Sequence, residues 1–177
     1  ATPESCPGLW SKLRDEFGSR RKETKAYPDV HPANAFVGNT LRLELLSRYG
    51  NVRQALSESV DYLLYMAEQT GTLWENVDSR ASCNHGFASH IVHVLFRDAV
   101  GIQAIDTNRK TVYIRFAEAG LPWCEGSVPT PDGPVRLKWR HQDGGAIAYH
   151  CAVPVGYEVR VENLTGRALQ REDAPAA

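Results

Sequence analysis

The sequence has no apolar run that approaches the roughly 20 residues a helix needs to cross a bilayer, and it has no excess of either charge. Among its 177 residues, 20 Lys and Arg are balanced by 21 Asp and Glu, so the formal net charge is -1. The longest basic run is Arg20, Arg21 and Lys22, which we expect in a solvated loop. These absences argue against membrane insertion and against nucleic acid as a partner.

Closely spaced cysteines are absent as well. The sequence contains no CxxC pair, and its four cysteines lie far apart, at Cys6, Cys83, Cys124 and Cys151. This spacing argues against a zinc ribbon and a dense disulfide framework, and it predicts buried free thiols. His90 and His93 lie about one helical turn apart, but no carboxylate or second Cys completes a ligand spacing beside them. We therefore expect no metal and no cofactor.

Glycines mark where four predicted helices end, because glycine accepts the left-handed conformation that commonly follows a helix. Apolar stripes at helical spacing stop before Gly18, Gly50, Gly71 and Gly101. Asn51 is predicted to cap the third helix, with Gln54 three residues on as its capping-box partner. The acidic residues on these helices are expected to face solvent, and they are Asp15, Glu16, Glu44, Glu58, Asp61 and Glu68.

The hydrophobic period changes from the helical one to two after residue 105. We predict half-buried strands over 112–116, 135–140 and 157–161, and a hairpin that joins 135–140 to 146–151. Three tryptophans stand in apolar stripes or strands and are predicted to be core residues, namely Trp10, Trp123 and Trp139. From Thr165 onward the chain becomes polar and Ala-rich, which predicts a frayed end.

The fold class that follows from these patterns is α+β. Residues 1–104 are predicted to form helices, residues 105–165 an antiparallel β domain, and residues 166–177 a flexible tail. Each half carries more apolar surface than its own elements cover, and the sequence has no initiator Met. We therefore expect a fragment of a longer protein, whose uncovered apolar surface favours self-association.

One segment between the third and fourth predicted helices carries a specific resemblance. It reads Gly71-Thr72-Leu73-Trp74-Glu75-Asn76 and then Ser82-Cys83-Asn84-His85-Gly86-Phe87-Ala88-Ser89-His90. This order resembles the Thr-x-Trp-Glu and Asn-His segments of bacterial α-L-rhamnosidases of glycoside hydrolase family 78. The similarity extends upstream to residues 27–36 and downstream into the strands. It implies four helices of an (α/α) six-hairpin barrel, followed by an antiparallel β-sandwich-like domain.

The chemistry of glycoside hydrolysis gives this segment a role. Inversion needs one carboxylic acid to protonate the leaving oxygen and a second carboxylate to activate water on the opposite face of the sugar. The resemblance implies that Glu75 is the general base and that His85 contacts a sugar hydroxyl. Trp74 offers an apolar wall to a deoxy sugar, and Asn84 is a further substrate-binding candidate. The alternative is local: Glu75 and Trp74 form a solvated surface pair, while His85 and Asn84 satisfy the start of the next helix.

The resemblance also implies what the chain lacks. In the family the general acid lies earlier in the barrel, and residues 1–70 contain no segment that resembles it. We expect the chain alone to be inactive, as part of an enzyme that cleaves terminal α-L-rhamnosyl groups from rhamnose-containing glycosides or polysaccharides. Two alternatives stay open. One is a non-catalytic carbohydrate-binding or assembly module, and the other is a six-hairpin glycosidase that acts on another sugar.

Overall fold

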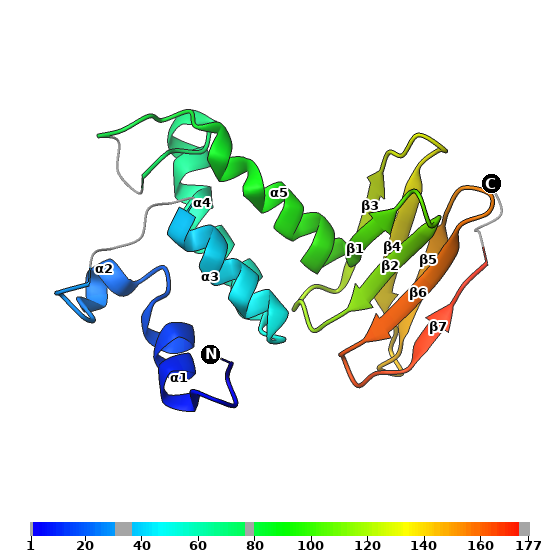
Figure 1. Ribbon diagram of the computed structural model, residues 1–177, viewed down its shortest axis with the longest axis horizontal. Coiled ribbons are helices and arrows are strands. Elements are labelled where there is room, and N and C mark those ends of the chain that lie inside the picture. The colour runs from blue at the N-terminus through cyan, green and yellow to red at the C-terminus, as the bar shows by residue number, and fades with distance from the viewer. Residues whose placement is uncertain (1, 31–36, 77–79, 174–177) are drawn as a thin grey trace. The chain divides into compact units, whose positions relative to one another are not determined.

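The computed structural model describes residues 2–30, 37–76 and 80–173. These residues form an α+β structure with two compact units, which we call unit 1 (Ala1–Val92) and unit 2 (His93–Ala177) (Figure 1). The upstream part of the family resemblance, at residues 27–36, lies partly outside the described residues. The motif-bearing loop is described except for residues 77–79.

Unit 1 is helical. Its elements are α1 (Pro7–Glu16), α2 (Arg21–Thr24), α3 (Val37–Arg48), α4 (Val52–Thr70), a 3-10 turn (Gly86–Ser89) and the start of α5 (His90–Val94). Helices α3 and α4 pack against each other, and Leu43, Leu46 and Ala55 are completely buried. In the part of the chain that the structure describes, no helix combines the length and the apolar character that a membrane span requires.

The predicted helix ends are confirmed at Gly71 but not at Gly18. Gly71 follows α4 with a φ of 71°, and its N–H donates to the Ala67 carbonyl at 2.7 Å. Helix α1 has already ended at Glu16. Gly18 allows a close approach instead, because a Cβ added there would lie 3.0 Å from Glu58 Oε1.

The capping box predicted for α4 is wrong. Asn51 precedes α4, but its side chain makes no capping hydrogen bond and donates to the Tyr49 carbonyl at 3.1 Å. The Gln54 amide donates to the Arg14 carbonyl at 2.7 Å and to Glu58 Oε1 at 2.8 Å. The Gln54 side chain therefore makes a tertiary contact with α1 instead of the capping hydrogen bond predicted for it.

The short basic run also differs from its prediction. Residues 21–24 form helix α2 rather than a loop. The Arg21 guanidinium donates to the carbonyls of Ala26 and Tyr27, at 3.1 Å in each case. Arg21 therefore stabilises the turn that follows α2.

Unit 2 combines the end of α5, a π-helical turn η2 (Leu95–Val100) and two sheets. Its described strands are β1 (Ile102–Asp106), β2 (Thr111–Phe116), β3 (Trp123–Val128), β4 (Val135–His141), β5 (Ile147–Ala152), β6 (Glu158–Asn163) and β7 (Leu169–Arg171). The strand order is β1-β2-β6 in one sheet and β3-β4-β5-β7 in the other (Figure 1). The predicted hairpin is confirmed as β4 and β5, with His141 opposite Ile147.

Both sheets are mixed, so the prediction of a purely antiparallel domain is wrong. The pairs β2–β6 and β5–β7 are parallel, while β1–β2, β3–β4 and β4–β5 are antiparallel. The chain changes sheet between β5 and β6 and again between β6 and β7. Strands that no hairpin joins can therefore lie side by side in parallel.

The two sheets share one hydrophobic core. The alternation predicted for β2 and β4 is confirmed, because the inward-facing side chains of both strands are buried, and these are Val112, Ile114, Phe116, Val135, Leu137 and Trp139. The Trp139 indole Nε1–H donates to the Ala99 carbonyl at 3.1 Å and to the Val100 carbonyl at 3.0 Å. Trp139 is therefore a core residue, as predicted.

Trp123 is not a core residue, which corrects the prediction. Its side chain, at the start of β3, is 57% exposed. Cys124 and Val128 of the same strand pack against the core. Because successive side chains of a strand point to opposite faces, Trp123 lies on the outer face of its sheet. Trp10 is half-buried, with its ring 5.1 Å from that of Tyr49.

The chain divides earlier than the sequence predicts. The predicted boundary lies between residues 104 and 105, whereas the two compact units meet between Val92 and His93. The turn η2 packs on β1 and β3, so the end of the last helix belongs to the β unit. At the other end, β7 lies inside the segment predicted to be a flexible tail, since it pairs with β5.

Strand β3 approaches η2 closely at Gly126. A Cβ added to Gly126 would lie 2.8 Å from Val100 Cγ2 and 3.3 Å from Phe96 Cε1. We expect Gly126→Ala to lower the free energy of unfolding by about 1–3 kcal/mol, because the added methyl group overpacks this contact. Thermal unfolding followed by circular dichroism measures the change. The control is Gly144→Ala, whose Cβ meets nothing within 4 Å, and equal midpoints for the two variants would contradict the expected contact.

Candidate functional site

The predicted site residues lie on the loop that begins where α4 ends. Two short segments of this loop, on either side of residues 77–79, are paired through their backbones. The Glu75 N–H donates to the Ser82 carbonyl at 2.8 Å, and the His85 N–H donates to the Leu73 carbonyl at 2.9 Å. The pairing places Glu75 and His85 on neighbouring segments, although they are ten positions apart in the sequence.

Trp74 anchors this loop to α4. Its side chain is 3% exposed and packs with Leu63 and Met66. The indole Nε1–H donates to Thr70 Oγ1 at 2.8 Å. Burial of the indole fixes the backbone at the position just before Glu75. Trp74 therefore has a structural role, and its contact with a sugar stays a prediction.

The other three candidates offer polar groups. Glu75 and His85 are half-buried, and Asn84 is exposed. The Ser82 hydroxyl donates to the Asn84 carbonyl at 3.1 Å, and the Ala88 N–H donates to the His85 carbonyl at 3.2 Å, so both backbones are held locally. A carboxylate, an imidazole and an amide are groups that can bind sugar hydroxyls, and the carboxylate can accept a proton from water.

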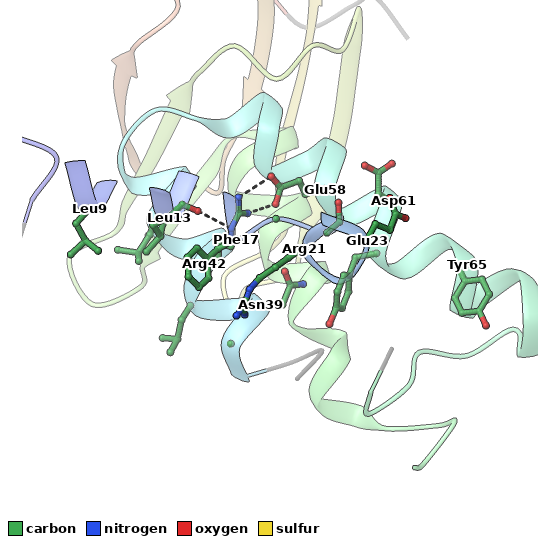
Figure 2. A pocket seen from close by; sticks show the side chains of 16 residues that line it. Leu9, Leu13, Phe17, Arg21, Glu23, Asn39, Arg42, Glu58, Asp61 and Tyr65 are labelled. Atoms are coloured by element: carbon green, nitrogen blue, oxygen red, sulfur yellow. Dashed lines mark hydrogen bonds and ion pairs between the residues drawn. The ribbon is translucent and has the colours of Figure 1, made fainter. Parts of the chain in front are cut away.

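A separate cavity of about 590 Å³ lies within unit 1, between α1, α3 and α4 (Figure 2). Its apolar lining includes Leu9, Leu13, Phe17, Leu41 and Leu45. Leu9 and Leu41 are 60% and 61% exposed. Among the described residues that line this cavity, none is a predicted site residue.

Sequence reasoning missed an ion pair at the wall of this cavity. The Arg42 guanidinium donates twice to the Glu58 carboxylate, once at 2.9 Å to Oε1 and once to Oε2, and the two side chains are 9% and 15% exposed (Figure 2). Arg42 also donates to the carbonyls of Leu13 at 3.3 Å and Arg14 at 2.7 Å. The prediction that Glu58 faces solvent is wrong. No local pattern marks the pair, because its two residues lie on different helices.

Metal-binding groups are not gathered anywhere in the described ranges, where no three His, Cys, Asp or Glu side chains are placed to hold a metal ion. The four cysteines are free, and Cys151 is buried while the other three are half-buried. Burial raises the pKa of the Cys124 and Cys151 thiols. A raised pKa keeps a thiol protonated at neutral pH, so these two are poor nucleophiles.

Comparison with known proteins shows two similarities. Residues 101–173 match the family model described as the bacterial alpha-L-rhamnosidase C-terminal domain. A search among curated proteins found no match. Among solved structures, the chain is similar to a GH78 family rhamnosidase of Bacillus sp. GL1, with a TM-score of 0.69 and 22% sequence identity over 78% of this chain. The chain spans 16% of the length of that rhamnosidase, and at this identity the similarity shows a shared fold. Residues 101–173, which lie in unit 2, thus match a bacterial α-L-rhamnosidase C-terminal domain, and the chain shares its fold with part of a GH78 family rhamnosidase.

Proposed function

We propose that the complete enzyme containing this chain hydrolyses terminal α-L-rhamnosyl groups with inversion, and that Glu75 is its general base. His85 and Asn84 bind the sugar, and Trp74, predicted as a sugar contact, supports the loop that carries them. The general acid lies outside this chain, which spans 16% of the rhamnosidase it resembles. Because protonation of the leaving oxygen is needed as well as activation of water, the chain alone is inactive.

The observation that carries this proposal is the anchored pairing of the loop. A general base has to be held about 3 Å from the water that it activates, and catalytic groups are commonly carried on loops fixed to a rigid scaffold. The backbone pairing on both sides of residues 77–79 and the buried indole of Trp74 supply that support for Glu75. A solvated surface pair would leave the indole exposed, so the burial of Trp74 favours a built site over the local alternative.

The finer architecture belongs to the same proposal. We infer that the helices of unit 1 are part of an (α/α) six-hairpin barrel, and that the two sheets of unit 2 form a β-sandwich-like domain. The shared core of the two sheets supports the second inference. Support for the first comes from apolar side chains of unit 1 that are half or more exposed, which are Leu9, Leu41, Val60, Leu64 and Val92. Further helices would cover them, and without such helices the surface favours self-association.

The test is an assay of the complete enzyme with p-nitrophenyl α-L-rhamnopyranoside and with the matched β-D-glucopyranoside and α-L-arabinofuranoside. We expect kcat/KM for the rhamnoside to exceed the others by about 100-fold or more, since site groups built to bond one sugar are left unpaired by another. Proton NMR at early times should show the β-anomer of rhamnose first, as inversion requires.

Any other outcome of this assay would support a different function. Faster turnover of another aryl glycoside would keep a six-hairpin glycosidase and change the sugar. Appearance of the α-anomer first would overturn the inverting mechanism. No turnover of any glycoside by the complete, folded enzyme would favour a non-catalytic carbohydrate-binding or assembly module, in which Trp74 and its loop serve packing alone.

A further inference from the structure

Two threonine hydroxyls lie where α4 passes into the loop that carries Glu75. Thr70 is the last residue of α4, and Thr72 follows the glycine that ends this helix. Their Oγ1 atoms are 2.6 Å apart, which is a hydrogen-bond distance. Thr70 Oγ1 also accepts from the Trp74 indole Nε1–H at 2.8 Å. On the other side, the Thr72 hydroxyl donates to the Cys83 carbonyl.

The direction of these hydrogen bonds follows by elimination. Each threonine hydroxyl has a single proton to donate, whereas a carbonyl only accepts and an indole N–H only donates. The bond to the Cys83 carbonyl uses the Thr72 proton, so the 2.6 Å contact between the hydroxyls uses the Thr70 proton. The opposite direction would send the Thr70 proton to the Met66 carbonyl, 3.3 Å away. It would also leave the Cys83 carbonyl against a hydroxyl oxygen with no proton between them. The bonds therefore run in one direction, and we call the series the threonine bridge, whose members in order are Trp74, Thr70, Thr72 and Cys83.

The threonine bridge joins both segments of the loop to the end of α4. Thr72 belongs to the segment before residues 77–79, and Cys83 belongs to the segment after them. Two backbone hydrogen bonds already pair these segments, one from the Glu75 N–H and one from the His85 N–H. The bond from Thr72 to Cys83 is a third connection, made by a side chain. Because the bridge continues through Thr70 into α4, it helps to set the spacing between the segments that carry Glu75 and His85.

The members of the bridge strengthen one another. A hydroxyl that donates a hydrogen bond becomes a better acceptor, so a chain of bonds in one direction is stronger than its separate bonds. The Trp74 end lies where water has little access, since this side chain is 3% exposed. Loss of one hydroxyl therefore weakens the neighbouring bonds as well. A loosened loop matters for a base, because a misplacement of about 1 Å can lower a rate by about 100-fold.

We propose that Thr70 and Thr72 are positioning residues, which hold the segments of Glu75 and His85 at the spacing that the reaction needs. They act through these two side chains and have no contact with the sugar to make. The positioning role rests on the proposed function, because the place of Glu75 affects the rate only if Glu75 is the base. The threonine bridge itself is a property of the 177-residue chain and can be measured without any activity.

The first measurement follows the bridge in the 177-residue chain labelled with ¹⁵N. The chain has four tryptophans, so Trp74→Phe identifies the indole N–H resonance of Trp74. Thr70→Val removes the acceptor of this indole and should move its proton resonance upfield. Thr72→Val keeps the acceptor but removes the next member of the bridge, so it should move the resonance in the same direction by a smaller amount. Thr72→Ser, which keeps the hydroxyl, should leave the resonance in place.

The second measurement is the steady-state kinetics of the complete enzyme with p-nitrophenyl α-L-rhamnopyranoside. Thr72→Val keeps the branched shape without the hydroxyl and should lower kcat by about 10- to 100-fold at an unchanged thermal midpoint. Thr72→Ser should recover most of the parent kcat, since it restores the donor and the acceptor. If Thr72→Val lowers the midpoint, Thr70→Val and Thr70→Ser provide the same comparison at the other hydroxyl. The control is Thr107→Val, an exposed threonine between β1 and β2, which should keep the parent kcat.

The two measurements distinguish the ways in which the proposal can fail. A Trp74 resonance that Thr72→Val leaves in place would show that the bonds are independent and would overturn the bridge. A resonance that moves while Thr72→Val keeps the parent kcat would make the bridge structural alone and would overturn the positioning role. Full activity of Glu75→Gln would overturn the proposed function and the positioning role together, while the shift of the Trp74 resonance would still report the bridge.

Discussion

If Glu75 is the general base, replacing it with Gln is expected to lower kcat/KM of the complete enzyme for p-nitrophenyl α-L-rhamnopyranoside by about 10²- to 10⁴-fold, the usual contribution of a positioned acid or base. The amide keeps the shape of the side chain but cannot accept a proton from water. Since Glu75 is half-buried and its backbone N–H, rather than its side chain, bonds to Ser82, the variant should fold normally. Steady-state kinetics and an unchanged thermal midpoint together measure the effect.

The matched control is Glu68→Gln, an exposed carboxylate on α4, which should retain full activity. A second variant separates a base from a merely structural carboxylate. In Glu75→Ala, added azide should attack the anomeric carbon as the bond to the protonated leaving oxygen breaks, and should yield the inverted rhamnosyl azide. Activity of Glu75→Gln within threefold of the parent, or no azide product, would remove Glu75 from the mechanism.

Replacing Glu58 with Gln is expected to destabilise unit 1 by up to about 3–5 kcal/mol, the typical cost of removing one partner of a buried ion pair. The change leaves the Arg42 guanidinium without a counter-charge at a position where it is 9% exposed. It also disturbs the Gln54 amide, which donates to the same carboxylate at 2.8 Å. Urea unfolding of the 177-residue chain, followed by the helical circular dichroism signal, measures the loss.

An exposed ion pair of the same unit provides the control. Asp15→Asn breaks the Arg14–Asp15 pair, whose side chains are 37% and 53% exposed, and should leave the midpoint unchanged because water screens it. The double variant Arg42→Met, Glu58→Leu should recover much of the loss, since an apolar pair removes the unpaired charge. If Glu58→Gln lowers the free energy of unfolding no more than Asp15→Asn does, the Arg42–Glu58 pair contributes nothing measurable to stability.

The candidate site shows how far sequence reasoning reaches. The motif order singled out Glu75 and His85, but the backbone pairing that places them on adjacent segments is a contact across residues 77–79 that no local pattern encodes. The same limit explains the role of Trp74. Its position beside Glu75 suggested a sugar contact, and only the packing on Leu63 and Met66 shows that the indole also anchors the loop.

The sequence by itself determined the features that depend on local physics. Gly71 takes the left-handed conformation that ends α4, and Gly101 does so after η2 with a φ of 102°, because only glycine adopts that conformation without a steric penalty. The alternation in β2 and β4 likewise identified which side chains are buried, since a strand with one buried face must alternate.

The tertiary structure decided everything that depends on partners distant in the sequence. Trp139 is buried and Trp123 exposed, although both are strand tryptophans, because the face of β3 that meets the core is set by its pairing with β4. Likewise, Glu58 has the helical setting of a solvent-facing acid, and Arg42 from another helix makes it half of a buried pair. The parallel pairing of β7 with β5 turned a polar, Ala-rich segment into part of a sheet. In each case the outcome depends on the free energy of a contact between elements that are distant in the sequence. A local sequence pattern carries no information about such a contact.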